Sequence, residues 1–213
     1  MNSRNRGRFA CSVLSAAYFP PIEYFRAIGR SDRILMESGE SYQKQSYRNR
    51  CNIYASDGVL PLVVPVAGSG SSAPITSVRI DYSKAWVRLH KRALVSAYRS
   101  SPFFEYYSDD IFAVLDSGEE YLFNLDIRLV RLMAKLVGIK FEAEMTDGFR
   151  KEYPDGCMDF RYTLHPKKEA PSQLSDGYRG GYYQVFGDRL GFRKGLSILD
   201  LLFNEGPNAI TYL

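Results

Sequence analysis

FACSVLSAAYFPPIEYFRAIGRSDRILME, residues 9–37, joins two short apolar runs through one short helical pattern. The runs 9–14 and 33–37 are each typical of a buried strand. Between them, Pro21 suits the first turn of a helix and Gly29 is a natural C-terminal stop. The apolar residues that recur at helical spacing are Ile22, Phe25 and Ile28. A strand, a helix and a second strand within about thirty residues predict a parallel βαβ unit.

Amphipathic helices are expected in the second half of the chain. Residues 86–98 place apolar side chains, with His90 among them, on one helical face. Ser117 and Glu120 form a capping box that would open a second helix, which Gly138 would end. The other expected elements are strands at 59–66 and 139–145, an extended segment at 75–80, a helix at 197–206, and loops at 68–74 and 147–181.

Length and composition favour one α/β domain covering residues 1–213, with a partly parallel sheet begun by the βαβ unit and with residues 1–8 as a flexible tail. The net charge is only +4, and basic residues alternate with acidic ones along most of the chain. This balance argues against a nucleic-acid partner. The sequence shows no membrane span and no signal-peptide pattern, so we expect a cytoplasmic protein.

The cysteines and histidines predict neither a metal site nor a cofactor. Cys11, Cys51 and Cys157 are odd in number and widely spaced, which favours free thiols over a disulfide scaffold. His90 and His165 lie far apart, and neither has a second ligand at helical or turn spacing.

The segment 41–52, SYQKQSYRNRCN, is rich in basic, amide and tyrosine side chains and contains no acid. In a sheet begun by a βαβ unit, ligands bind beyond the carboxyl ends of the strands, where Tyr18 and the segment 37–50 would lie. The segment is therefore the expected surface for an anionic small molecule. The predicted ligand-binding residues are Tyr18, Lys44, Tyr47, Arg48, Asn49 and Arg50.

Several of these residues have two interpretations. Arg48 and Arg50 either hold the phosphates of a ligand or form a salt-bridged network with Glu37, Glu40 or Asp57. Glu37 is either a catalytic base or a strand-end carboxylate paired with one of these arginines.

His90 has two interpretations as well. The ring is either a core residue with satisfied nitrogens or an acid or base that faces a cleft, because its ordinary pKa suits proton transfer near neutrality.

The chain resembles the WbqC-like family through blocks that span most of its length. They are Tyr18–Phe25 (YFPPIEYF), YQK at 42–44, YRNR at 47–50, VPV at 64–66, Trp86, His90, Tyr98, PFF at 102–104, YQVF at 183–186 and LSILDLLFNEGP at 196–207. The chain departs from the family in one place: where many members carry acidic residues after the second strand, it has Glu37 followed by Ser38, Gly39 and Glu40. The resemblance therefore assigns no role in binding or catalysis to that acidic position here.

The resemblance implies a role in assembling bacterial surface polysaccharides such as O-antigen. It suggests a transferase that moves a glycyl or other aminoacyl group to a nucleotide-linked amino sugar, with His90 as base and the segment 41–52 on the diphosphate. The alternative is a non-catalytic factor that binds a nucleotide sugar or contacts a glycosyltransferase.

Overall fold

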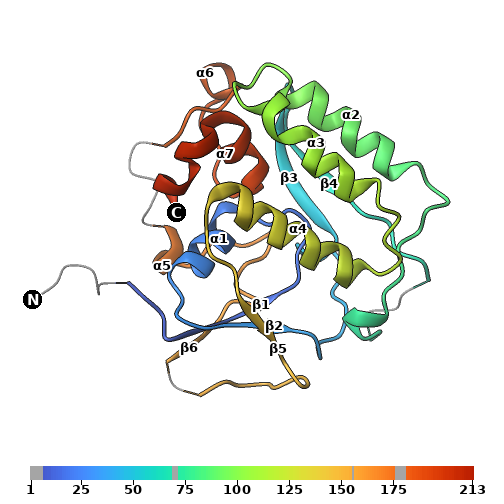
Figure 1. Cartoon of the computed structure of the whole chain (residues 1–213), viewed down its shortest axis with the longest axis vertical. Coiled ribbons are helices and arrows are strands. Elements are labelled where there is room, and N and C mark those ends of the chain that lie inside the picture. Colours follow the sequence, from blue (N-terminus) through green and yellow to red (C-terminus); the bar gives the residue numbers. More distant parts are fainter. Residues whose placement is uncertain (1–6, 69–71, 155, 176–180) are drawn as a thin grey trace, which may run out of the picture.

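The computed structural model describes residues 7–68, 72–154, 156–175 and 181–213. Within these ranges, a four-stranded parallel sheet in the order β5-β2-β1-β6 forms the lower end of the molecule (Figure 1). Its strands are β1 (Cys11–Ser15), β2 (Ile34–Glu37), β5 (Ala143–Met145) and β6 (Cys157–Asp159). β1 pairs with both β2 and β6, so the first strand of the chain lies inside the sheet.

The N-terminal βαβ unit is confirmed, since α1 (Ile22–Gly29) connects β1 to β2 and these strands pair in parallel. Every residue of α1 from Ile22 to Ile28 is buried, including two charged ones. One of them, Arg26, donates from Nε to the carbonyl of Tyr212 at 2.8 Å and from a guanidinium nitrogen to the carbonyl of Leu174 at 3.0 Å. α1 is therefore a central helix, held by backbone from the C-terminal third of the chain.

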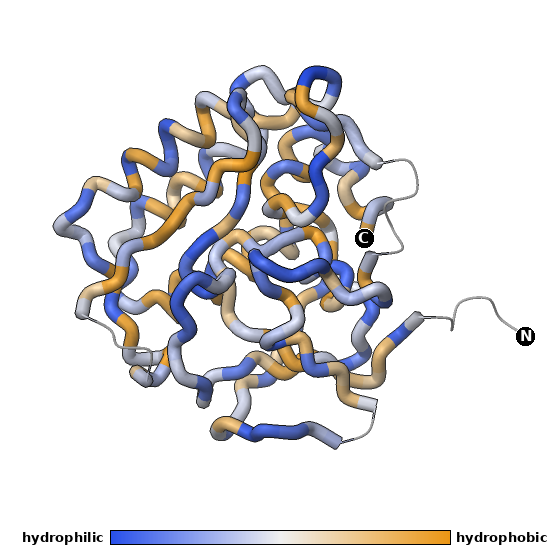
Figure 2. The backbone as a smooth tube through the Cα atoms, turned by 180° about the vertical axis from the view of Figure 1, so that it is seen from behind, coloured by the Kyte–Doolittle hydropathy of each residue, from blue (hydrophilic) through white to orange (hydrophobic). Residues whose placement is uncertain are grey.

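The helices of the second half pack above the sheet together with a β-hairpin (Figure 1). The hairpin is formed by β3 (Arg50–Ala55) and β4 (Gly58–Val63), and the apolar run of β4 is the long orange stretch seen from behind in Figure 2. The longer helices are α2 (Trp86–Tyr98), α3 (Phe104–Leu115), α4 (Leu122–Val137) and α7 (Ile198–Glu205). The shorter ones are α5 (Ser172–Ser175), α6 (Gly187–Leu190) and the 3-10 turns η2 (Ile75–Ser77) and η3 (Gly206–Tyr212).

The predicted α/β class with amphipathic helices in the second half agrees with this architecture. α2 has the predicted bounds, and the final helix begins after Ser197, whose hydroxyl accepts from the amide of Leu199 as an N-cap. Gly138 ends α4 in the left-handed conformation, with φ of 80°. In the described residues no helix is both long and apolar enough to cross a membrane.

The predicted capping box at Ser117 is wrong. α4 begins at Leu122, five residues later, and Ser117 instead donates to the carbonyl of Val114 at the end of α3. Gly118, with φ of 67°, turns the chain between the two helices. A serine followed by an acid three residues on is found at turns as well as at caps, because its hydroxyl bonds local backbone in both.

The region 147–181 was predicted to be surface loops, and the structure corrects this prediction too. It contains β6, which completes the sheet beside β1, and it buries Arg161 directly after that strand. β6 has only three residues, which is too short for a recognisable hydrophobic period. The extended segment at 75–80 begins as the turn η2, and of the strand 139–145 only its end is β5.

Three predicted tail or loop segments lie partly outside the described residues, namely 1–6 of the tail, 69–71 of the loop 68–74, and 155 and 176–180 of the loops at 147–181. The remainder of the tail is held, because Arg8 forms an ion pair with Asp32.

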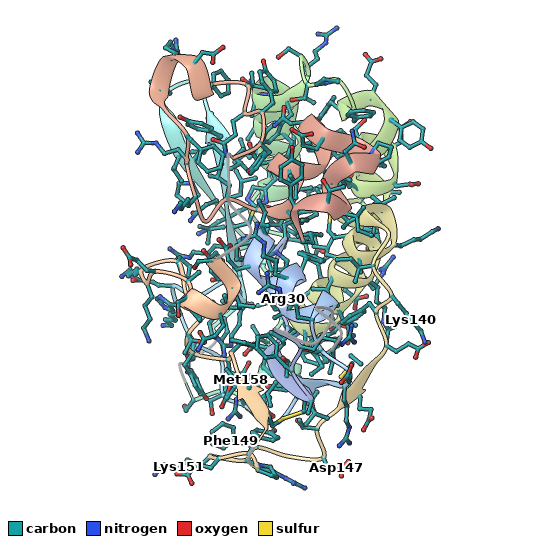
Figure 3. All side chains as sticks on the ribbon, turned by 90° about the vertical axis from the view of Figure 1, so that its left-hand side faces the viewer. Arg30, Lys140, Asp147, Phe149, Lys151 and Met158 are labelled. Atoms are coloured by element: carbon teal, nitrogen blue, oxygen red, sulfur yellow. A yellow bond between two sulfur atoms is a disulfide. The ribbon has the colours of Figure 1, made fainter. Side chains whose placement is uncertain are left out.

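The expectation of three free thiols is wrong, because Cys11 and Cys157 form a disulfide. They are register partners on the neighbouring strands β1 and β6, and the bond lies beside the sheet in Figure 3. Only their pairing in three dimensions reveals the bridge, since 146 positions separate them in sequence. Cys51 is free and buried.

Candidate ligand-binding cleft

The carboxyl ends of the parallel strands carry an ion-pair network of five residues, four of them buried and Asp159 partly exposed: Glu37, Glu40, Arg48, Asp159 and Arg161. Glu37 is the last residue of β2 and Asp159 the last of β6, so the strands themselves place these carboxylates. Charged groups are rarely buried unless they are paired, and here each has a partner of opposite charge.

Arg161 bridges two strands of the sheet. Its guanidinium donates to Glu37 Oε2 at 2.6 Å and forms a bidentate pair with Asp159. The other oxygen of Glu37 accepts from the amide of Gly39 and from Thr146 Oγ1, each at 2.8 Å. The rings of Phe149, at the lower edge of Figure 3, and of Tyr153 each lie 5.0 Å from the guanidinium carbon. The role of Glu37 as a base stays a prediction, but its site is that of a structural carboxylate.

Arg48 forms the second half of the network. Its Nε donates to Glu40 Oε1 at 2.8 Å, a terminal nitrogen pairs with Glu40 Oε2, and the same nitrogen donates to Ser15 Oγ at 2.7 Å. Both side chains of this pair are almost fully buried. The alternative that Arg48 joins a salt-bridged network therefore describes its geometry, with Glu40 as its partner.

A narrow cavity is lined by Ser15, Arg48 and Arg161, and it shares Tyr47 and Leu164 with a larger cleft. The cleft has a volume of about 590 Å³, which lies in the range of small-molecule sites. Its walls come from the start of α1, the β3–β4 hairpin, the segment 164–175 and residues 194–195. Its polar lining consists of Glu23, Tyr47, Asn52, His165, Lys168, Glu169, Ser172, Ser175 and Lys194.

His165, in the wall of the cleft, lies in the field of four cations. Burial lowers the pKa of its imidazole, and the positive charges of Lys168, Lys167, Arg48 and Arg50 lower it further. These four cations come from two segments more than a hundred residues apart, and one of the two is the predicted segment 41–52. The fold therefore gathers their positive field at one histidine in the wall of the cleft.

The tautomer of His165 follows from a backbone contact. The amide of Lys167 donates to His165 Nδ1 at 3.1 Å, so Nδ1 is an acceptor and the ring proton of the neutral form resides on Nε2. A neutral imidazole with Nε2–H can donate a hydrogen bond to an anionic or carbonyl oxygen.

The predicted base His90 lies elsewhere, in the core. Its Nδ1 is 2.8 Å from the hydroxyl of Tyr18, and its ring packs on Trp86. Burial lowers the pKa of His90 to about 4, and a hydrogen bond to the backbone of Val63 only partly opposes this. Neither His90 nor Tyr18 lines the cleft or the narrow cavity, so their roles in catalysis and binding stay predictions without a described cavity beside them.

The other predicted binding residues are divided between cleft, core and surface. Tyr47 lines the cleft, and burial followed by the charge of Glu23 raises the pKa of its hydroxyl. Asn49 is buried and donates from Nδ2 to the carbonyl of Val64 at 3.0 Å, which braces the segment. Lys44 is exposed, and Arg50 begins β3.

The motif at 18–21 has a backbone role. The amide of Tyr18 donates to the carbonyl of Tyr47 at 2.8 Å, which joins the end of β1 to the segment 41–52. Phe19 has φ of 39°, a conformation that costs energy for a residue other than glycine. This turn delivers Pro21 and Glu23 to the cleft.

Sequence reasoning missed Glu23, Asn52, His165, Lys168 and Lys194 as lining residues of the cleft. The sequence signal for this wall of the cleft was a small basic cluster formed by His165, Lys167 and Lys168. It was weak because the cluster lies in a region that the sequence predicts to be loops. Their relation to the segment 41–52 exists only in the folded chain.

The two histidines should both titrate below their ordinary pKa of about 6.5. Proton NMR should give His90 a midpoint near pH 4 and His165 a midpoint below 6.5. Because folding favours the neutral rings, the contribution of the two histidines to the free energy of unfolding is fully present above about pH 6.5. It declines as the pH falls toward 4. His90 alone contributes roughly 3 kcal/mol to this loss. The variant His165→Gln identifies which NMR signal belongs to His165. A His165 midpoint above 6.5 would contradict the effect of the four cations on its pKa.

Comparison with known proteins places the chain in a family. The model of the WbqC-like protein family matches residues 16–159, about two thirds of the chain. The chain belongs to the WbqC-like protein family. The matched range includes the turn at 18–21 and the segment 41–52, whereas Arg161, His165 and Lys168 follow it. The cleft is thus built from the matched range and from the C-terminal part together.

A relative of this WbqC-like chain is the uncharacterised protein Rv1507c of Mycobacterium tuberculosis. The two are 28% identical over 229 residues, which cover 95% of this chain and 96% of the relative. Because the alignment covers 95% of this chain, it includes residues 164–195, which contain the C-terminal wall of the cleft. No solved structure matches the chain with significant similarity.

Proposed function

We propose that this WbqC-like protein is a transferase of surface-polysaccharide biosynthesis, as in O-antigen, and that its cleft binds a nucleotide-linked amino sugar. The observation that carries the proposal is that His165, which lines the cleft, feels the positive charges of Lys168, Lys167, Arg48 and Arg50, which lower its pKa. A diphosphate is the part of a nucleotide sugar that such a positive field attracts most strongly. The cleft volume of about 590 Å³ suits a ligand of this size.

Within this proposal, Lys168 and the Nε2–H of His165 contact the diphosphate. Tyr47 and Asn52, which also line the cleft, hold the sugar through hydrogen bonds and ring contact. Asn52 takes the role predicted for Asn49, whose amide nitrogen already donates to backbone. Arg48 is paired with Glu40 and lines the adjoining narrow cavity, so it does not contact the ligand in the cleft.

The proposed reaction moves a glycyl or other aminoacyl group to the sugar amine. The amine nitrogen forms a bond to the acyl carbon, the bond from that carbon to the leaving oxygen or sulfur of the donor breaks, and the amine loses a proton. Glu23 lines the cleft and is the carboxylate that we propose takes this proton. Neither His90 nor Glu37 is needed for this step.

The binding part is tested with UDP and UDP-linked amino sugars in a thermal-shift assay. A ligand at about 100 times its Kd stabilises the folded state by about 2.7 kcal/mol. Lys168→Glu should weaken binding by about tenfold or more, whereas Lys135→Glu on the exposed side of α4 changes the same charge and should have no effect. Absence of stabilisation by every nucleotide tried at millimolar concentration would refute the nucleotide-binding site.

A second candidate is a non-catalytic factor that holds a nucleotide sugar for a glycosyltransferase. The observation that favours it is the burial of both predicted catalytic residues, His90 and Glu37, in hydrogen-bonded sites. Glu23→Gln separates the candidates when product is followed by mass spectrometry. A transferase should lose turnover and keep its affinity for UDP-sugar, and a binding factor should form no product in either variant.

The cytoplasmic location belongs to the same proposal, because nucleotide sugars are its substrates. The Cys11–Cys157 bridge would then have to persist in a compartment where disulfides are uncommon.

A further inference from the structure

A second concave surface lies between α2 and α3, which run side by side at the upper right of Figure 1. This α2–α3 groove has a volume of about 700 Å³. Its apolar lining consists of Tyr82, Ala85, Val87, Val95 and Phe112, and Tyr82 and Val95 expose 44% and 36% of their surface. A recessed apolar surface open to solvent is a feature of binding sites on soluble domains.

The rim of the groove is positively charged. Arg88 and Arg92 lie four residues apart on one side of α2, and Lys84 lies in the bend that precedes the helix. Within the described part of the chain, these three side chains make no ion pair. The single acid of the lining, Asp116, is already paired with Lys91 at 2.6 Å, and Lys91 also lies 5.2 Å from the ring of Phe112.

From this combination we propose that the α2–α3 groove binds an amphipathic anion, namely a phosphate carried on a linear apolar chain. The three cations together outweigh the charge of a phosphate monoester, which is about −1.5 to −2 at neutral pH. Arg88 and Arg92, one helical turn apart, can bind its oxygens in a bidentate manner. The recessed surface of Val87, Val95 and Phe112 takes the apolar chain. The ligand is a single molecule, because a concave surface between two helices encloses a chain and a flat bilayer face would not enter it.

The groove and the cleft are separate sites. They share no lining residue, and the cleft lies between α1, the hairpin and the C-terminal segments. The proposal for the groove therefore does not depend on the nucleotide-sugar function proposed for the cleft.

The single tryptophan of the chain provides the measurement. Trp86 opens α2, is 3% exposed, and its ring lies 5.7 Å from that of Tyr82, which lines the groove. Titration with decyl phosphate below its micelle concentration should change Trp86 fluorescence in a saturable way. Decanol and inorganic phosphate, which each offer half of the ligand, should bind more weakly by about tenfold or more.

Variants test the assignment of residues. Arg88→Ala with Arg92→Ala should weaken decyl phosphate binding by about tenfold or more, and Val95→Asp should do the same. The matched control is Arg131→Ala with Lys135→Ala, which removes two exposed cations from α4 and should leave affinity unchanged. Circular dichroism checks that each variant is folded.

Three results would overturn the proposal. The first is that decyl phosphate binds no more tightly than decanol, and the second is that the Arg88/Arg92 variant binds as tightly as the α4 control. The third is that the protein sediments with phosphatidylglycerol vesicles yet gives no saturable response to monomeric decyl phosphate, which would make this face a membrane-docking surface.

Discussion

Replacing Arg161 by methionine is expected to lower the free energy of unfolding by about 3–5 kcal/mol. The side chains of Arg161 and Glu37 are both fully buried, and their closest atoms are 2.6 Å apart. Methionine fills similar space but leaves the carboxylate of Glu37 buried without a cation. Urea unfolding followed by circular dichroism measures the effect.

The control for this variant is Arg33→Met. Arg33 pairs with Glu144 between the neighbouring strands β2 and β5, but these side chains are 56% and 60% exposed. Its loss should cost less than about 1 kcal/mol. The double variant Glu37→Met with Arg161→Met removes both charges and should recover part of the lost stability. Equal losses for Arg161→Met and Arg33→Met would contradict the buried ion-pair network.

Removing the disulfide should have an effect of similar size. Cys11 and Cys157 close a loop across 146 positions of sequence, and a long closed loop restricts the unfolded chain strongly. The variant Cys11→Ser with Cys157→Ser should lose about 3–5 kcal/mol of unfolding free energy. A reductant should destabilise the wild-type chain by a comparable amount and should leave the double variant unchanged.

Thiol titration provides an independent check of the bridge. The denatured, non-reduced wild-type chain should show one reactive thiol, that of Cys51, which is buried in the folded state. Three reactive thiols would mean that the bridge is absent.

The parts of the fold that were predictable from sequence are those with local repetition. The βαβ unit lies within about thirty residues and has its own helical period and stop residue, so residues 9–37 predict it directly. α2 is equally regular. β6 has three residues and no period, and it pairs with β1, whose register partner Cys11 lies 146 positions before Cys157.

For the candidate site, the sequence predicted the location of the binding segment but not the partners of its side chains. The segment 41–52 stands out by composition and lies where the βαβ unit predicts, at the strand ends. Its arginines carry no information about their partners, because Glu40 and His165 approach Arg48 only after folding. His90 illustrates the opposite case, since a histidine on an apolar helical stripe has the same sequence pattern whether it faces a cleft or the hydroxyl of Tyr18.

The strand order β5-β2-β1-β6 has a consequence for the growing chain. β1 leaves the ribosome early, yet its β6 neighbour is translated 146 residues later, as the spacing of the paired cysteines shows. At about 5–20 residues per second, one edge of β1 stays unpaired for roughly 7–30 s of synthesis. During this interval β1 and β2 offer an open apolar edge to other chains. We therefore expect slow translation or a shortage of chaperones to reduce the yield of folded protein before any step of ligand binding is affected.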